Sequence, residues 1–270
     1  MNTMDCRPIG VFDSGVGGLT VVRALMDRLP FENIVYFGDT ARVPYGVKSV
    51  GTIEQFTQQI VEFLLKREVK ALIIACNTIA AVAADRVRQM AGGIPVLDVI
   101  DAGARAAVEA TRTGDIGVIA TSTTVNSNAY ARAIHQLDPH TRVYSQACPL
   151  FVPLVEEGWL DHEVTRLTAL EYMKSVLVEQ VDTVVLGCTH YPLLKPLLTD
   201  VTDGRVTLVD SAVTTAEATA QRLAAAGLLN PSRSVPDYHF YVSDIPLRFQ
   251  TIGERFLGRS MRDLEMVKLG

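Results

Sequence analysis

The chain lacks the features that mark several classes of protein. Its 270 residues include only four cysteines, too few for a disulfide framework, and the cytoplasm would keep them reduced. The net charge is −5 and no lysine- or arginine-rich run stands out, which argues against nucleic-acid binding. Residues 1–8 contain an acid, a base and a proline where a signal peptide needs an apolar stretch. We therefore expect a cytoplasmic protein with a small-molecule partner.

Long hydrophobic segments are also missing. The longest charge-free apolar run, residues 71–84, is shorter than the roughly 18 residues of a membrane-spanning helix and contains the polar pair Asn77-Thr78. Hydrophobic residues nevertheless make up 48% of the chain, enough for a substantial core in one large or two small domains. The composition thus predicts a globular protein without a membrane segment.

Apolar strand-like runs alternate with longer helix-like stretches rich in Ala, Leu, Arg, Glu and Gln. The runs in the first part of the chain are Ile9–Phe12, Ile34–Phe37, Ala71–Ala75 and Val96–Val99. This alternation is typical of βαβ units and a mainly parallel sheet. Runs that are apolar at every position, such as Val184-Val185-Leu186, indicate strands covered by helices on both faces. The expected fold class is therefore α/β.

The second part of the chain repeats features of the first. The matches are Ile9-Gly10-Val11-Phe12 with Ile116-Gly117-Val118-Ile119, Val35-Tyr36 with Val143-Tyr144, Val43-Pro44 with Val152-Pro153, Cys76 with Cys188, and Asp101 with Asp210. In that order their offsets are 107, 108, 109, 112 and 109 residues. Two unrelated α/β halves can share such strands, but matches in one order at nearly one offset favour a duplicated unit.

The tail of the chain has no copy in the first half. After Asp210, a helix-like stretch over residues 214–229 precedes a strand-like run, Tyr238–Val242, and a final helical segment. We expect this tail to pack on the first unit. The predicted domains are residues 1–98 with 210–270, and residues 99–209, each a mainly parallel sheet flanked by helices.

Polar residues follow the predicted strands at their carboxyl ends, where open parallel sheets bind ligands. The four loops are Asp13-Ser14-Gly15-Val16-Gly17-Gly18, Asn77-Thr78, Thr121-Ser122-Thr123-Thr124 and Thr189-His190. Small hydroxyl and amide side chains with exposed backbone N–H groups can hold a carboxylate. A nucleotide is disfavoured, because the glycine loop lacks the third glycine of a dinucleotide fingerprint and no Gly-Lys-Ser/Thr occurs.

Cys76 and Cys188 end two matched strands, each where a helix is predicted to begin. A helix N-terminus lowers the pKa of a thiol toward neutrality, so both thiols could exchange protons near pH 7. Two equivalent thiols facing one cleft suggest proton removal on one face and return on the other. A zinc site with His190 or a redox disulfide is the alternative, but neither a fourth ligand nor a Cys-x-x-Cys motif accompanies them. Cys6 and Cys148 fit ordinary buried thiols.

Four segments together carry a family resemblance. They are Phe12–Leu19, Gly38–Gly46, Cys76–Thr78 and Gly187–Pro192. With them, and nearly end to end, the chain resembles the glutamate racemase family of the aspartate/glutamate racemase superfamily. The resemblance implies an isomerase that interconverts L- and D-glutamate without a cofactor or a metal and supplies D-glutamate for bacterial peptidoglycan and the cell wall. It also implies two α/β domains related by a pseudo-two-fold axis, with the active site in the cleft between them, and it allows a homodimer.

The resemblance further assigns roles to single residues. The position of Cys76 removes the α-proton of the D-enantiomer, that of Cys188 removes the α-proton of the L-enantiomer, and Asp13 and His190 assist these catalytic thiols. The side chains and backbone expected around the substrate are those of Asp13, Ser14, Pro44, Tyr45, Gly46, Asn77, Thr78, Thr121, Thr124, Thr189 and His190.

Nearby charged residues are expected to have lesser roles. Glu156 is a weaker candidate, as an acidic partner for His190, and Glu157 could serve equally. Asp39 and Arg42 are expected to form an ion pair that shapes their loop.

Three other functions fit parts of this pattern. A racemase of the same superfamily acting on aspartate would share both thiols and differ in the reach of its pocket. A non-catalytic carboxylate-binding protein would need neither cysteine. A thiol hydrolase with His190 as its base would need one cysteine, so separate replacement of Cys76 and Cys188 distinguishes it from a two-base racemase.

Overall fold

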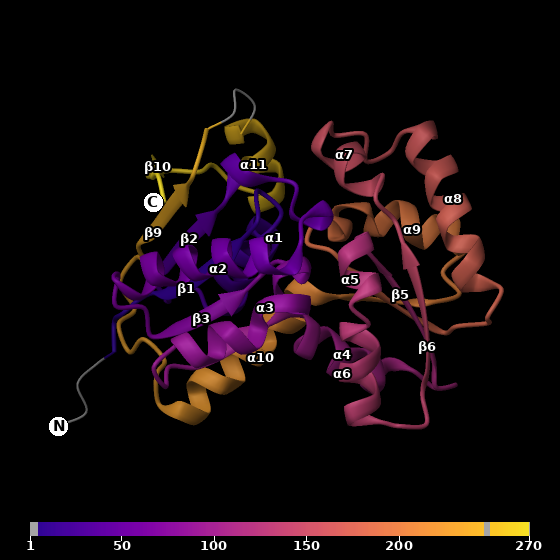
Figure 1. Ribbon diagram of the computed structural model, residues 1–270, viewed down its shortest axis with the longest axis horizontal. Helices are drawn as coiled ribbons and strands as arrows, with labels where there is room; N and C mark the ends of the chain where they lie inside the picture. Colours follow the sequence, from indigo (N-terminus) through magenta and orange to yellow (C-terminus); the bar gives the residue numbers. More distant parts are fainter. Residues whose placement is uncertain (1–4, 246–248, 270) are drawn as a thin grey trace.

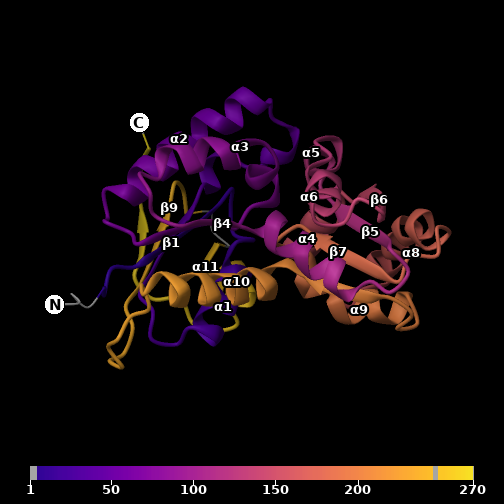
Figure 2. The same ribbon diagram turned by 90° about the horizontal axis from the view of Figure 1, so that it is seen from below.

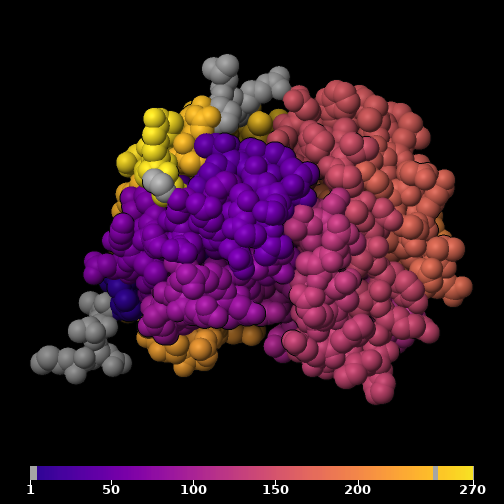
Figure 3. Space-filling view, viewed as in Figure 1, coloured from indigo at the N-terminus to yellow at the C-terminus, as the bar shows by residue number. Residues whose placement is uncertain are grey.

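The computed structural model describes residues 5–245 and 249–269. Within these ranges the chain forms two parallel sheets flanked by helices, which confirms the predicted α/β class. The two halves lie side by side, and the yellow C-terminal segment shares one half with the indigo N-terminal part of the chain (Figure 1). In the space-filling view the two halves meet along a seam that runs down the face (Figure 3).

The first sheet has the strand order β10-β9-β2-β1-β3-β4 among the described residues, and its paired strands are parallel. Its strands are β1 (Ile9–Asp13), β2 (Ile34–Gly38), β3 (Ala71–Ile74), β4 (Val96–Asp98), β9 (Tyr238–Val242) and β10 (Leu264–Met266). Strands β1, β2 and β3 are buried at every position, as their continuous apolar runs predict.

The helices of this half lie on both faces of the sheet. Those on one face are α1 (Leu19–Arg28), α10 (Ser211–Ala226) and α11 (Phe249–Leu257), and those on the other are α2 (Val50–Leu65) and α3 (Asn77–Met90) (Figure 2). Two single turns of 3-10 helix, η1 (Thr40–Arg42) and η2 (Tyr45–Val47), lie between β2 and α2. No helix in the described part of the chain is both long and apolar enough to cross a membrane.

The second sheet has the order β6-β5-β7-β8 and is also parallel. Its strands are β5 (Asp115–Ala120), β6 (Arg142–Ala147), β7 (Thr183–Gly187) and β8 (Thr207–Asp210). The helices of this half are α4 (Val99–Ala110), α5 (Ser122–Asn126), α6 (Ala129–Leu137), α7 (Phe151–Glu156), α8 (Glu163–Leu177), η3 (Tyr191–Leu194) and α9 (Lys195–Val201). Helix α10 packs against both α1 and α4 and so joins the two halves.

The strand order supports the duplication but corrects its register. The order β2-β1-β3-β4 recurs as β6-β5-β7-β8. Because Ile9 pairs with Ile34 and Ile116 pairs with Val143, the second-strand match is displaced by one residue from the predicted Val35 to Val143. The match of Val43-Pro44 with Val152-Pro153 is wrong, since the first pair lies in a loop and the second inside α7.

The structural counterpart of Asp210 is Asp98 rather than Asp101. Each of the two is the N-cap of the helix that follows, and its carboxylate accepts hydrogen bonds from the backbone two and three residues on. This cap also explains why α10 begins at Ser211 and not at residue 214, while Gly227, at φ 66°, ends it. The predicted domain boundaries themselves stay a prediction, although β9 hydrogen-bonds to β2 of the first sheet.

Candidate active site

The loop after β1 is built around the buried Asp13. The backbone N–H of Gly15 donates to its Oδ1 at 2.8 Å, and the Tyr36 hydroxyl donates to the Gly15 carbonyl at 2.6 Å. Burial raises the pKa of Asp13, while the Gly15 N–H and the charge of His190 oppose that shift. The loop therefore holds a carboxyl group, largely hidden from water, at the end of the first strand.

Cys76 is the N-cap of α3 and is 5% exposed. Its thiol donates to Ser14 Oγ at 3.4 Å. Burial raises its pKa to about 12, the charge of Asp13 adds to the effect, and hydrogen bonds from Ser14 and the Ile79 N–H oppose it. The predicted shift toward neutrality is therefore wrong for Cys76, because desolvation outweighs the helix N-terminus.

Cys188 follows β7 and is also buried, but no α-helix begins there. The chain instead turns into the short η3, so the predicted helix N-terminus is wrong at this position. Cys188 has the His190 ring beside it instead of a helix N-terminus. His190 Nδ1 lies 3.8 Å from Cys188 Sγ, and its Nε2 lies 2.9 Å from Glu156 Oε1. Burial lowers the pKa of His190, but its hydrogen bonds to Cys188 and Glu156 prevail and raise that pKa to about 10. The pairing expected of Glu156 is confirmed, and it favours the protonated form of His190.

The loop after β1 meets the Cys188 loop across the halves of the molecule. Thr189 Oγ1 donates to Asp13 Oδ2 at 3.4 Å, and Thr20 Oγ1 donates to the Thr189 carbonyl at 3.0 Å. A Cβ atom at Gly17 would lie 2.2 Å from Thr189 Oγ1 and 2.6 Å from the His190 ring, so only glycine allows this approach. The structure thus brings Asp13, Thr189 and His190 together as predicted.

A second contact between the halves is a chain of hydroxyl groups. Thr78 Oγ1 lies 3.1 Å from Thr121 Oγ1, which lies 3.0 Å from Thr124 Oγ1. The Thr123 hydroxyl donates to the Gly46 carbonyl at 2.6 Å. The predicted residues of α3, α5 and the η2 turn are therefore neighbours.

The loop around η2 is organised by the buried Asp39. Arg42 Nε lies 2.6 Å from Asp39 Oδ2, which confirms the expected ion pair, and the Tyr45 and Ser243 hydroxyls also donate to this carboxylate. Because its hydroxyl bonds to Asp39, the buried Tyr45 shapes the loop from within. Pro44 is exposed and precedes η2 as its N-cap.

Several residues near the thiols carry no motif and were not predicted. The ring of Phe256, on α11, stands edge-on to His190 at 5.0 Å between centroids. Arg255 Nη1 lies 3.3 Å from the carbonyl oxygens of Val155 and Glu156, to which it donates. The C-terminal helix thus supports the His190–Glu156 pair from the other half, a contact between segments about 100 residues apart that no local pattern reveals. Tyr130, on α6, was missed for the same reason.

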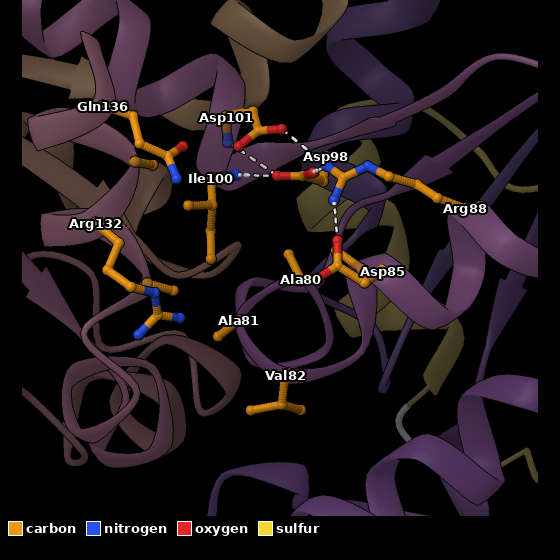
Figure 4. A pocket seen from close by; sticks show the side chains of 13 residues that line it. Ala80, Ala81, Val82, Asp85, Arg88, Asp98, Ile100, Asp101, Arg132 and Gln136 are labelled. Carbon is orange, nitrogen blue, oxygen red and sulfur yellow. Dashed lines mark hydrogen bonds and ion pairs between the residues drawn. The ribbon is translucent and has the colours of Figure 1, made fainter.

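A separate cavity of about 300 Å³ lies between α3, α4 and α6 (Figure 4). Arg88 enters it paired with Asp98 and Asp101, and Arg132 reaches in from α6. Neither thiol lines this cavity, so it is distinct from the predicted site.

The cysteines and charged side chains do not form a metal site in the described part of the chain. All four cysteines lie in the described part of the chain and are free thiols, and Cys6 is exposed rather than buried as expected. Among the described residues no three His, Cys, Asp or Glu side chains are grouped to hold a metal ion.

Comparison with known proteins identifies the class. A model of the Asp/Glu/Hydantoin racemase family matches residues 18–219. A glutamate racemase from Neisseria meningitidis is 69% identical over 264 residues, covering 98% of this chain and 97% of that protein. A crystal structure of glutamate racemase from Francisella tularensis in complex with D-glutamate has a TM-score of 0.93 at 47% identity, covering 98% of this chain and 99% of that one.

These matches and the paired thiol loops define an amino-acid racemase of the Asp/Glu/Hydantoin racemase family. A glutamate racemase from Syntrophus aciditrophicus, 68% identical over 99% of both chains, narrows the assignment further. Within this class, the chain belongs to the glutamate racemase family.

Proposed function

We propose that this protein interconverts L- and D-glutamate without a cofactor, by moving the α-proton between two thiols. The observation that carries the proposal is the unequal setting of the two cysteines. Burial and the charge of Asp13 oppose the ionisation of Cys76, whereas Cys188 lies 3.8 Å from the ring of His190, whose pKa is raised by its hydrogen bonds to Cys188 and Glu156. A two-base racemase needs one thiolate and one thiol at the start of each turnover, and this setting favours Cys76 as the thiol when L-glutamate binds.

In the L-to-D direction, Cys188 is the base and Cys76 is the acid. The Cys188 thiolate takes the α-proton from one face of the substrate, and the Cys76 thiol delivers its own proton to the opposite face. The two sulfurs thereby exchange protonation states. In the D-to-L direction Cys76 must be the thiolate, and the donors opposing its raised pKa, from Ser14 and Ile79, are placed to stabilise that charge.

The carbanion formed between the two steps needs stabilisation at the α-carboxylate. Asn77 and Thr78 occupy the first turn of α3, where backbone N–H groups have no partner within the helix. The hydroxyls of Thr121 and Thr124 continue this donor surface from the second half. Neutral donors in a site that excludes water suit a carboxylate that gains charge in the transition state.

We further infer that the predicted substrate residues act in two ways. Those that offer donors directly are Ser14, Gly46, Asn77, Thr78, Thr121, Thr124 and Thr189. Asp13 and His190 set the protonation of the thiols, Tyr45 fixes the loop through Asp39, and Pro44 sets its turn.

The product fits a role in the cell wall. The relatives from Neisseria meningitidis and Syntrophus aciditrophicus are named glutamate racemase, which supports glutamate over aspartate as the substrate. We propose that the protein acts in the cytoplasm and supplies D-glutamate for peptidoglycan.

We also propose that its two domains are divided between residues 98 and 99 and between residues 209 and 210.

The proposal is tested by incubating purified protein with L-glutamate in deuterated water, without added cofactor. We expect the circular dichroism of the amino acid to decay to zero while deuterium enters the α-carbon. Activity with L-aspartate alone would assign the other substrate of the superfamily. Silence with both amino acids would contradict a racemase.

A further inference from the structure

Tyr130, on α6, contacts the segments that carry both thiols. Its hydroxyl donates to Asn77 Oδ1 at 2.7 Å, and Asn77 directly follows Cys76. Its ring lies against Gly187, which directly precedes Cys188, since a Cβ atom there would be 3.0 Å from Tyr130 Cε2. One side chain therefore contacts both the residue after Cys76 and the residue before Cys188.

The ring occupies a slot that two glycines keep open. A Cβ atom at Gly103 would lie 3.2 Å from Tyr130 Cε1 and from its hydroxyl, and one at Gly187 would also crowd Ala120 of β5. Gly103 lies inside α4, where glycine destabilises a helix relative to alanine and no left-handed backbone conformation requires it. The room it leaves is filled by Tyr130, which is 2% exposed. The phenol is thus fixed in place as well as buried.

The contact with Asn77 leaves half of that amide unused. Asn77 is 2% exposed, its Oδ1 accepts from Tyr130, and its Nδ2 has no hydrogen-bond partner among the described residues. A buried amide without a partner is unfavourable, and a carboxylate is a strong acceptor for it. Burial raises the pKa of the Tyr130 phenol, so it stays a neutral donor throughout the working range.

We propose that Tyr130 is a positioning residue that orients the Asn77 amide. By occupying Oδ1, its hydroxyl leaves the two Nδ2 hydrogens as the amide's remaining groups, available to the α-carboxylate of the substrate beside Cys76. Its ring packs against Gly187 and so fixes the position of this amide relative to the strand end that precedes Cys188. The inference rests on the proposed function and adds to it a residue from the second half, outside every motif.

The test replaces Tyr130 by Phe, which keeps the ring in its slot and removes the hydroxyl. We expect kcat/KM to fall about tenfold, mainly through kcat, because the hydrogen bond to the carboxylate strengthens as charge builds there. The fall must be equal in both directions, since the two enantiomers have the same free energy in water. Tyr172→Phe is the matched control and should keep wild-type kcat/KM. Tyr172 lies on α8, and its hydroxyl accepts a hydrogen bond from the backbone N–H of Leu150 and not from a predicted site residue.

A double-mutant cycle separates positioning from simple packing. In an Asn77→Ala background, Tyr130→Phe should cause no further loss of kcat/KM, because the amide it orients is gone. Asn77→Ser serves in the same cycle if the alanine variant does not fold. The inference would be overturned if Tyr130→Phe had the kcat/KM of the wild type, or if the losses of the two single variants multiplied in the double variant. The proposed racemase function would stand in either case. An inactive wild-type protein would overturn the proposed function and this inference with it.

Discussion

Replacing Glu156 by Gln tests the acid-base arrangement around Cys188. Glu156 Oε1 lies 2.9 Å from His190 Nε2, and its side chain is 42% exposed. Because solvent screens a pair that is this exposed, we assign about 1 kcal/mol to the stabilisation of protonated His190 by the Glu156 charge. Removing that charge should therefore lower the pKa of His190 by about 0.7. The variant keeps an amide that can still accept a hydrogen bond, so the ring should stay in place.

The assay is the pH profile of kcat/KM, which reports groups of the free enzyme. In the wild type His190 should deprotonate near pH 10, and we expect an alkaline limb there. Glu156→Gln should move that limb down by about 0.7 pH unit, with a loss of about fivefold beyond it and less than about twofold near pH 7. Glu157→Gln is the matched control, one residue further along. An unmoved limb, or a loss equal at every pH, would refute the reasoning.

The remaining predictions concern the thiols, the loop contact and stability. Cys76→Ala and Cys188→Ala should each lower racemisation by about 10²- to 10⁴-fold in a coupled D-glutamate assay, and retention of racemisation by either variant would contradict the two-thiol mechanism. Gly17→Ala should abolish activity, because its Cβ would lie 2.2 Å from Thr189 Oγ1, whereas Gly51→Ala, with nothing within 4 Å, should leave kcat unchanged. The stability that His190 contributes is complete below about pH 6.5 and should fall as pH rises through about 10, since its folded pKa lies above the unfolded one. Urea unfolding of wild type and His190→Gln should therefore differ more at pH 6.5 than at pH 10.5, and a constant difference would contradict the raised pKa.

Strand positions in this fold could be predicted because burial on both faces leaves a local mark. Strands such as β1 and β3 are unbroken apolar runs, and their observed ends differ from the predicted ends by one residue. Strand β10 was missed, since it has only three residues, lies at the sheet edge and contains an exposed Glu265. The sequence match paired Asp101 with Asp210, whereas the structural counterpart of Asp210 is Asp98. The match compared neighbouring residue types, but an N-cap is defined by where its helix begins, which the residue types alone did not show.

The candidate site was predictable where its residues belong to loops after strands. Asp13, Cys76 and His190 are of this kind, and the structure places them near one another across the halves. Protonation was not predictable from position alone, because burial raised the pKa of Cys76 against the effect of its helix. Tyr130 could not be predicted either, since its contact with Asn77 joins residues 53 apart in the chain.

The most direct measurement follows the label in each enantiomer at early times. L-glutamate is converted in deuterated water, and the two enantiomers are separated and analysed by mass spectrometry before a tenth has reacted. If Cys188 removes the proton and Cys76 delivers another, the D-glutamate formed carries deuterium while the remaining L-glutamate stays largely unlabelled. D-glutamate that retains the original hydrogen would show one base acting on both faces and would contradict the two-thiol account.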